Sequence, residues 1–188
     1  EFRRALLTIF DRGLTDRDTL DKAADQLIDI VQTETNTPQA ELTRLRDLAS
    51  QAQEYPYLLA RIRLEEGRLL EEMNRDQQAA DAYQRAASLA MQAPLNAAKA
   101  ARNLAALHAE AGKLGKAIDS LRSVESDLET VMGPDVQSTL DEMHSRIVRY
   151  FVRKGRTELL LGDPLLALNT YEQLLDYDPE AVEGWRGK

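Results

Sequence analysis

The sequence predicts an all-α protein in which antiparallel helix hairpins stack one after another as an α-solenoid. Three observations support this class. One spacing of small, turn and large apolar residues occurs three times along the chain. Alanine and leucine, both strong helix formers, are abundant. Only six prolines and nine glycines interrupt the 188 residues, so long helices are permitted.

The repeated spacing starts with a small residue, followed by a turn residue, an alanine and a large apolar residue at constant offsets. These positions are Gly67, Asn74, Ala79 and Tyr83 in the first repeat, Ala105, Gly112, Ala117 and Leu121 in the second, and Gly155, Gly162, Ala167 and Tyr171 in the third. Gly or Asn at the turn tolerates the left-handed conformation that ends a helix. The small residues leave room where two helices cross, so each repeat predicts a helix–turn–helix. One hairpin cannot bury its apolar stripe alone, and stacked neighbours cover it.

This pattern resembles the tetratricopeptide repeat family, with the third repeat as the best match through Gly155, Gly162, Ala167, Tyr171 and Pro179. Trp185 stands where a further repeat would place its tryptophan. The resemblance covers residues 60–188 and implies a right-handed solenoid. The implied repeats span about 60–93, 98–131 and 148–181, and a fourth begins at 182–188.

The second and third repeats are unusually far apart. Ala79 and Ala117 are separated by 38 residues, and Ala117 and Ala167 by 50, against a usual period of 34. The excess corresponds to roughly four helical turns. We therefore expect lengthened helices around 124–147, one over about 114–131 and one over about 136–161, broken at Gly133-Pro134-Asp135.

Residues 1–59 match the repeat poorly but have helical spacing, and we interpret them as divergent repeats or a cap. Asp16 and Asp18 are candidate caps of a helix that runs to about Thr33. Thr37-Pro38 is expected to begin the next helix, with Thr37 as its cap. Tyr55-Pro56 marks the following boundary.

Composition excludes several functional classes. The net charge of −8 and the pI of about 4.9 argue against nucleic acid as a partner, because such binding needs a basic surface. The absence of cysteine excludes disulfides and thiolate metal sites. No apolar run is long enough for direct membrane insertion. The chain starts with Glu1 and ends inside a repeat, so we expect a segment of a longer protein. Its compartment stays open between the cytoplasm and the bacterial periplasm.

The sequence predicts no catalytic residue, no metal site and no cofactor. His108 falls at a packing position and is expected in or near the core, whereas His144 is expected on a solvated face. The acidic pairs Glu65-Glu66 and Glu71-Glu72 are also interpreted as a solvated face. Core positions are predicted for Leu104, Leu107, Ile118, Leu121, Leu159, Leu166 and Leu174.

Candidate binding residues follow from the resemblance, which implies that the first helix of each hairpin lines the concave face. In this register the face contains mainly basic side chains, although the chain is acidic. The candidates are Arg61, Leu64 and Arg68 in the first repeat, Lys99, Arg102 and Asn103 in the second, and Arg149, Arg153 and Arg156 in the third. Because arginine forks pair well with carboxylates, the predicted partner is an acidic protein or peptide segment. Ordinary solvated side chains, some paired with acids of neighbouring helices, remain the alternative.

Three functional hypotheses are consistent with these features. The first is a protein–protein interaction scaffold that performs no bond chemistry. The second is a self-association module, a homo-oligomer within an assembly such as a bacterial secretion or polysaccharide-export machine. The third is a segment that regulates an enzyme whose active domain lies elsewhere in a longer chain. The sequence does not identify the partner.

Overall fold

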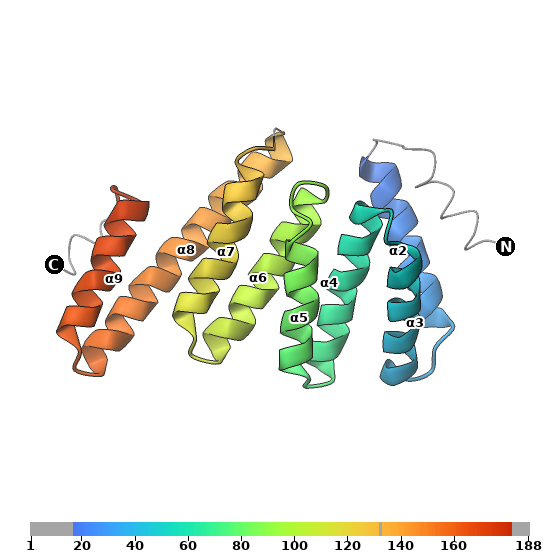
Figure 1. Ribbon diagram of the computed structural model, residues 1–188, viewed down its shortest axis with the longest axis horizontal. Coiled ribbons are helices and arrows are strands. Elements are labelled where there is room, and N and C mark those ends of the chain that lie inside the picture. The colour runs from blue at the N-terminus through green and yellow to red at the C-terminus, as the bar shows by residue number, and fades with distance from the viewer. Residues whose placement is uncertain (1–16, 132, 182–188) are drawn as a thin grey trace. The chain divides into compact units, whose positions relative to one another are not determined.

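The computed structural model describes residues 17–131 and 133–181, and these residues form helices joined by short turns, without a β-strand (Figure 1). The helices are α2 (Arg17–Thr33), α3 (Pro38–Gln51), α4 (Pro56–Glu72), α5 (Asp76–Ala87), α6 (Pro94–Glu110), α7 (Leu114–Leu128), α8 (Pro134–Leu160) and α9 (Pro164–Tyr177). The predicted all-α class is confirmed.

The chain divides into an N-terminal unit that ends at Ala100 and a C-terminal unit that begins at Ala101, inside α6. In the N-terminal unit, α2 packs against α3 and α4, α3 against α4, and α4 against α5. In the C-terminal unit, α8 packs against both α7 and α9. Within α2–α5 and within α7–α9, helices adjacent in the chain are thus packing partners, as in stacked hairpins.

Helix starts in the N-terminal unit follow the local sequence signals. The Thr37 hydroxyl accepts a hydrogen bond from the Ala40 N–H at 3.2 Å, and Pro38 occupies the first turn of α3. This cap and the predicted boundary at Tyr55-Pro56 are confirmed, because α4 begins at Pro56. The predicted cap residue Asp16 and the side chain of Asp18 lie outside the described residues, although α2 does run to Thr33.

The predicted turn residues end three helices in the same way. Asn74, Gly112 and Gly162 have φ angles of 56°, 73° and 82°. After each of them, the next N–H donates to the carbonyl five residues back, as in Arg75 N–H to Leu70 O at 2.8 Å. This Schellman arrangement satisfies carbonyls that the helix end leaves free. The positive φ favours glycine and, among other residues, asparagine.

The paired small and large positions meet at the helix crossings. Gly67 of α4 lies against the ring of Tyr83 of α5, and Gly155 of α8 lies against the ring of Tyr171 of α9. The alanines Ala79, Ala117 and Ala167 are all buried. The constant spacing therefore reflects one hairpin geometry.

The extra residues between the second and third repeats lie mainly in one helix. α8 has 27 residues, whereas α7 has 15 and α9 has 14. The helices expected over about 114–131 and 136–161 correspond to α7 and α8, but α7 ends at Leu128 and Pro134 starts α8, so α8 carries most of the extra length. Pro134 lies in the first turn of α8, where its missing N–H costs no hydrogen bond.

Two predicted core leucines lie at the surface. Leu159 is 47% exposed and Leu166 is 44% exposed, so their assignment to the core was wrong. Leu174 is buried, as predicted. Of the predicted core positions in the second repeat, Leu104, Ile118 and Leu121 are buried, and Leu107 is partly exposed. The predicted fourth repeat at 182–188, including Trp185, lies outside the described residues.

Candidate protein-binding surface

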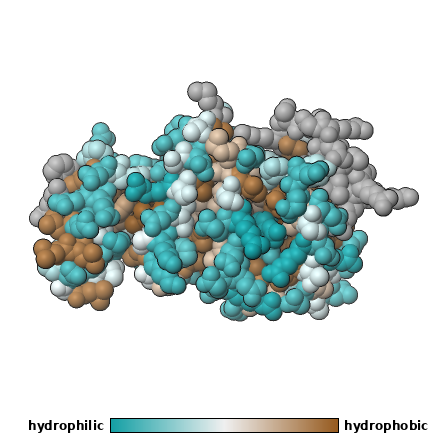
Figure 2. Space-filling model, viewed as in Figure 1, coloured by the Kyte–Doolittle hydropathy of each residue, from teal (hydrophilic) through white to brown (hydrophobic). Residues whose placement is uncertain are grey.

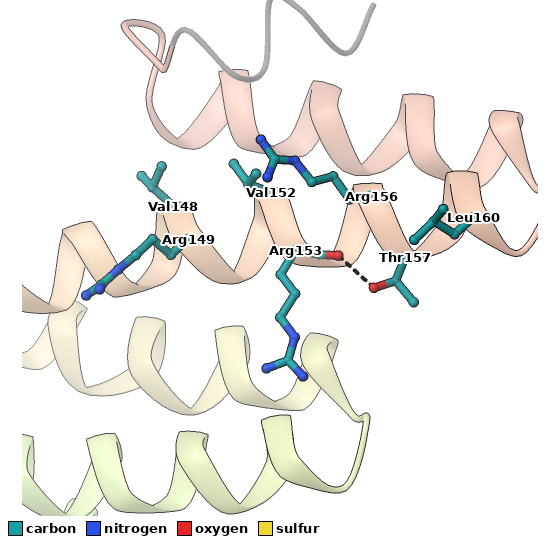
Figure 3. Close-up of a pocket in the computed structure, with 7 residues that line it drawn as sticks. All are labelled: Val148, Arg149, Val152, Arg153, Arg156, Thr157 and Leu160. Carbon is teal, nitrogen blue, oxygen red and sulfur yellow. Dashed lines mark hydrogen bonds between the residues drawn. The ribbon is translucent and has the colours of Figure 1, made fainter.

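A hollow of about 430 Å³ lies along the C-terminal half of α8. Val148, Val152 and Leu160 provide its apolar lining, and three of the predicted binding residues, Arg149, Arg153 and Arg156, add positive charge. Figure 3 shows the three guanidinium groups spread along this stretch of helix. The side chains recur every three or four residues because those positions share one face of a helix.

The three arginines have no carboxylate partner among residues 17–131 and 133–181. The Arg149 Nε donates only to the main-chain Ser145 oxygen of its own helix, at 3.2 Å. All three side chains are exposed. The hollow therefore combines an apolar lining with positive charge that no described acidic side chain neutralises.

The first-repeat arginines occupy a different electrostatic setting. Arg61 donates to Asp25 of α2 through Nη2 at 2.9 Å and also pairs with Glu65. Arg68 pairs with the same Glu65 oxygen at 3.1 Å. Burial alone would lower the pKa of Arg61, but Glu65 and Asp25 outweigh it and raise the pKa. These two arginines are therefore neutralised within the N-terminal unit.

Leu64 does not contribute to an accessible surface. It is 3% exposed and belongs to the core of the N-terminal unit. A leucine one turn from a candidate arginine faces inward here because α4 is covered by helices on more than one side. Its burial removes Leu64 from the residues that a partner can contact.

The second-repeat candidates differ in their surroundings, as the first-repeat candidates do. Arg102 donates to the Glu142 carboxylate of α8 at 2.6 Å, and Arg146 donates to the other oxygen of that carboxylate at 3.0 Å. These arginines lower the pKa of Glu142. Lys99 is exposed and Asn103 is partly exposed. Among the candidate residues, the third-repeat arginines are thus the set that lines one hollow without a carboxylate partner in the described part of the chain.

The acidic pairs of α4 are not the solvated face that the sequence suggested. Glu66 is buried, and its carboxylate accepts from Arg46 Nε at 2.7 Å and from Arg63. Glu71 accepts from the Tyr83 hydroxyl. Glu72 does face solvent. The solvated interpretation was wrong for Glu66 because the arginine of a neighbouring helix covers it.

His144 keeps 45% of its side chain exposed, as expected for a solvated position, but it also has partners that the sequence did not indicate. Its ring stacks on Tyr177 at 4.9 Å, and its Nε2 lies 3.2 Å from the Asp178 carboxylate. The Tyr177 hydroxyl donates to Glu125 at 2.6 Å. Burial, followed by the hydrogen bond to Glu125, raises the pKa of Tyr177, and burial raises that of Glu125. The cluster ties α7, α8 and the end of α9 together.

His108 is half-buried, which confirms its expected place in or near the core. Burial and the nearby Lys116 and Lys113 lower its pKa. Among the described residues, no group of His, Asp and Glu has an arrangement that would hold a metal ion. No helix within the described ranges has the length and apolar character needed to cross a bilayer.

Sequence reasoning missed a surface formed by leucines at the turn from α8 to α9. Leu160, Leu161 and Leu165 are 88%, 79% and 78% exposed. Figure 2 shows hydrophobic side chains gathered over this end of the C-terminal unit. A signal was present in the sequence, because the other two repeats place no leucine at the same offsets.

Comparison with known proteins does not assign the chain to a family. No family model matches it, and no curated protein matches it. Among solved structures, the chain is similar to the crystal structure of BtubC (BKLC) from P. vanneervenii, with 19% identity and a TM-score of 0.47. That match covers 94% of this chain and 70% of the other.

Proposed function

We propose that the protein is a non-enzymatic interaction scaffold of the tetratricopeptide type, and that the hollow on α8 binds an acidic segment of a partner protein. The observation that supports this function is the set Arg149, Arg153 and Arg156, which lines an apolar hollow without a described carboxylate partner. The hairpin geometry at Gly155, Gly162 and Tyr171 supports the family assignment.

The electrostatics of the hollow favour an anionic ligand. Arg149 and Arg156 are separated by seven residues of α8, or about 10 Å along the helix axis. Three unpaired positive charges within that distance repel one another, and carboxylates placed among them relieve the repulsion. Planar guanidinium groups bind carboxylates through paired hydrogen bonds, so an acidic segment gains both charge and geometric complementarity.

The valines make the hollow selective for a segment that can displace water. Val148 and Val152 lie beside the arginines on α8, and their partly exposed apolar surface is covered when a peptide lies along the helix. Binding sites in proteins commonly combine such an apolar lining with a few charged groups that orient the ligand. Recognition here needs shape and charge and no bond chemistry.

The test uses a fluorescein-labelled peptide of eight glutamates and measures binding by anisotropy. The double variant Arg153→Glu and Arg156→Glu should weaken binding at least about tenfold, because two attractive charges become repulsive. The wild-type affinity should also fall as salt rises from 50 to 300 mM. These two positions are a sharper choice than Arg102, whose charge Glu142 already neutralises.

The matched control is Lys22→Glu with Arg85→Glu, which changes net charge equally at exposed positions of the N-terminal unit. It should leave the affinity within about twofold, because a long-range charge effect is screened at physiological salt. Equal weakening by both double variants would show that net charge, and not the α8 hollow, determines binding. Unchanged affinity in the α8 variant would refute the proposed site.

A further inference from the structure

The turn from α8 to α9 exposes a cluster of leucines that the proposed charge recognition does not use. We call Leu160, Leu161, Leu165 and Leu166 the leucine turn, and they are 88%, 79%, 78% and 44% exposed. They surround Gly162-Asp163-Pro164, where the chain reverses direction. Single exposed leucines are common on proteins, but a contiguous apolar cluster marks an interaction surface.

Comparison with the other hairpins shows that the exposure is not a property of this turn geometry. The same offsets hold Glu72, Met73, Gln77 and Gln78 in the first repeat and Glu110, Ala111, Gly115 and Lys116 in the second. Glu72, Gln77 and Gln78 are exposed although further helices follow them in the chain. These positions therefore face solvent in a continuing array as well, and there the other repeats carry mainly polar side chains.

Leu168 has a different explanation and does not belong to the leucine turn. Its counterpart in the second repeat, Ile118, is buried, and its counterpart in the first, Ala80, is partly covered. A helix that follows α9 would cover Leu168 in the same way. No such coverage is expected for Leu160, Leu161 or Leu165, so their apolar surface needs another occupant.

The leucine turn is continuous with the arginine hollow. Leu160 belongs to both, because it lines the hollow together with Arg153 and Arg156. It follows Arg156 by four residues, which places it one helical turn away on the same face of α8. Along about 16 Å of α8, from Arg149 to Leu160, the surface thus changes from cationic to apolar.

We infer that the partner segment carries apolar residues next to its carboxylates, and that the leucine turn receives those apolar residues while the arginines hold the acids. This inference rests on the proposed function and specifies the partner's chemistry. In extended conformation about three residues span the arginines and about two more reach Leu160. The predicted partner motif is therefore a short acidic stretch adjoining two or three large apolar side chains.

The charges around the turn favour this occupant over a lipid surface or a second copy. Asp163 lies at the apex of the turn, where its carboxylate caps α9 by accepting from the Leu166 N–H at 3.0 Å. Insertion of the leucines into a bilayer would carry that charge into the apolar layer. A symmetric contact with a second copy would set the unpaired arginines of both copies against each other.

The experiment compares peptides of one length on the intact chain by fluorescence anisotropy. One peptide contains eight glutamates, and two contain five glutamates with Leu-Phe-Leu placed after or before them. One of the mixed peptides should bind at least about tenfold tighter than the glutamate peptide, because it buries apolar surface on the leucine turn. Both orders of the acidic and apolar residues are tested, because the peptide can lie along α8 in either chain direction.

Variants then separate the two proposals. Leu161→Ser with Leu165→Ser, two residues that do not line the hollow, should remove the advantage of the mixed peptide and leave the affinity for the glutamate peptide unchanged. Leu168→Ser is the matched control and should leave both affinities within about twofold. Both residues of the double variant are exposed, so circular dichroism should show an unchanged fold.

Each remaining outcome has a defined meaning. If Arg153→Glu with Arg156→Glu weakens binding but the leucine variant keeps the mixed peptide's advantage, the leucine turn is not the apolar subsite and the proposed function stands. If the arginine variant binds both peptides like wild type, the proposed function itself fails. Leucine-dependent binding to phosphatidylserine vesicles without peptide selectivity, or leucine-dependent dimerisation in sedimentation, would overturn the inference in favour of a lipid surface or a second copy.

Discussion

Tyr83 lies so close to the backbone of Gly67 that a Cβ atom on Gly67 would stand 2.3 Å from the Cε1 atom of the Tyr83 ring. The same relationship joins Gly155 to Tyr171, at 2.7 Å to the ring. In each case a residue of the first helix meets the residue sixteen positions later in the second helix. The missing side chain allows α4 to approach α5 and α8 to approach α9.

We predict that Gly67→Ala destabilises the protein by about 1–3 kcal/mol, because the added methyl group forces the Tyr83 ring or the helices apart. Gly115→Ala is the control, since its Cβ would meet nothing within 4 Å and α7 gains helix propensity. The control should be neutral or up to about 0.5 kcal/mol more stable. Urea unfolding followed by circular dichroism gives both values, and equal stability of the two variants would contradict the close contact.

A second prediction concerns the turn between α8 and α9. Gly162 has a φ of 82°, and nothing lies within 4 Å of the position a Cβ would occupy, so Gly162→Ala changes only the backbone energy. The expected cost is about 1–2 kcal/mol, because residues with a Cβ disfavour the left-handed region. Asn74→Gly, at the corresponding turn after α4, should change stability by less than about 0.5 kcal/mol. A neutral Gly162→Ala in thermal unfolding would mean that this turn is not held left-handed.

Glu66 provides a test of the buried charge network. Its carboxylate, 4% exposed, accepts from Arg46 and Arg63. Glu66→Ala should destabilise the protein by on the order of 2 kcal/mol, because it leaves the part-buried Arg63 guanidinium without its partner. Glu72→Ala, exposed on the same helix, should stay within about 0.5 kcal/mol of wild type. Chemical denaturation measures both, and a Glu66→Ala protein as stable as wild type would show that the pair contributes nothing net.

Stability should depend on pH through Glu125. Burial raises the pKa of this carboxyl in the folded protein, so the folded state binds its proton more tightly than the unfolded state does. The stability contribution of Glu125 is therefore present below its ordinary pKa and is lost as pH rises through the raised folded value. Glu125→Gln keeps an acceptor for the Tyr177 hydroxyl and removes the ionisation.

The Glu125→Gln protein should match wild type near pH 4 and become more stable than wild type near pH 8, where the buried carboxyl has lost its proton. Urea unfolding at pH 4, 6 and 8 checks this. If the stability advantage of Glu125→Gln over wild type shrinks as pH rises, the raised pKa of Glu125 in the folded protein is contradicted.

Local chemistry made the hairpins predictable. Gly112 and Gly162 predicted left-handed helix ends because few other residues adopt that conformation, and Thr37-Pro38 predicted a helix start through capping. The offset from Gly155 to Tyr171 predicted a helix crossing. The extra length between the repeats was also visible in the sequence. Its division between α7 and α8 was not, because it depends on α7 ending at Leu128 and α8 starting at Pro134.

The candidate site was predicted less completely. The register placed Arg149, Arg153 and Arg156 on one face, and the structure shows them around one hollow. The same register predicted both Leu64 and Arg61 as binding residues. In the structure Leu64 is buried and Arg61 is paired with Asp25. A helical pattern shows which residues share a face, but it does not show which neighbouring helix covers that face.

The sequence by itself determined the repeated helix–turn–helix, because turn conformation, helix propensity and the sixteen-residue offset act within one hairpin. Only the tertiary structure decided which charges are neutralised and which leucines are exposed. Arg61 meets Asp25 across 36 residues, and Glu125 meets Tyr177 across 52. Such pairings depend on the packing of separate helices. Among the described residues, this packing leaves the α8 arginines without a carboxylate partner and the leucine turn in solvent.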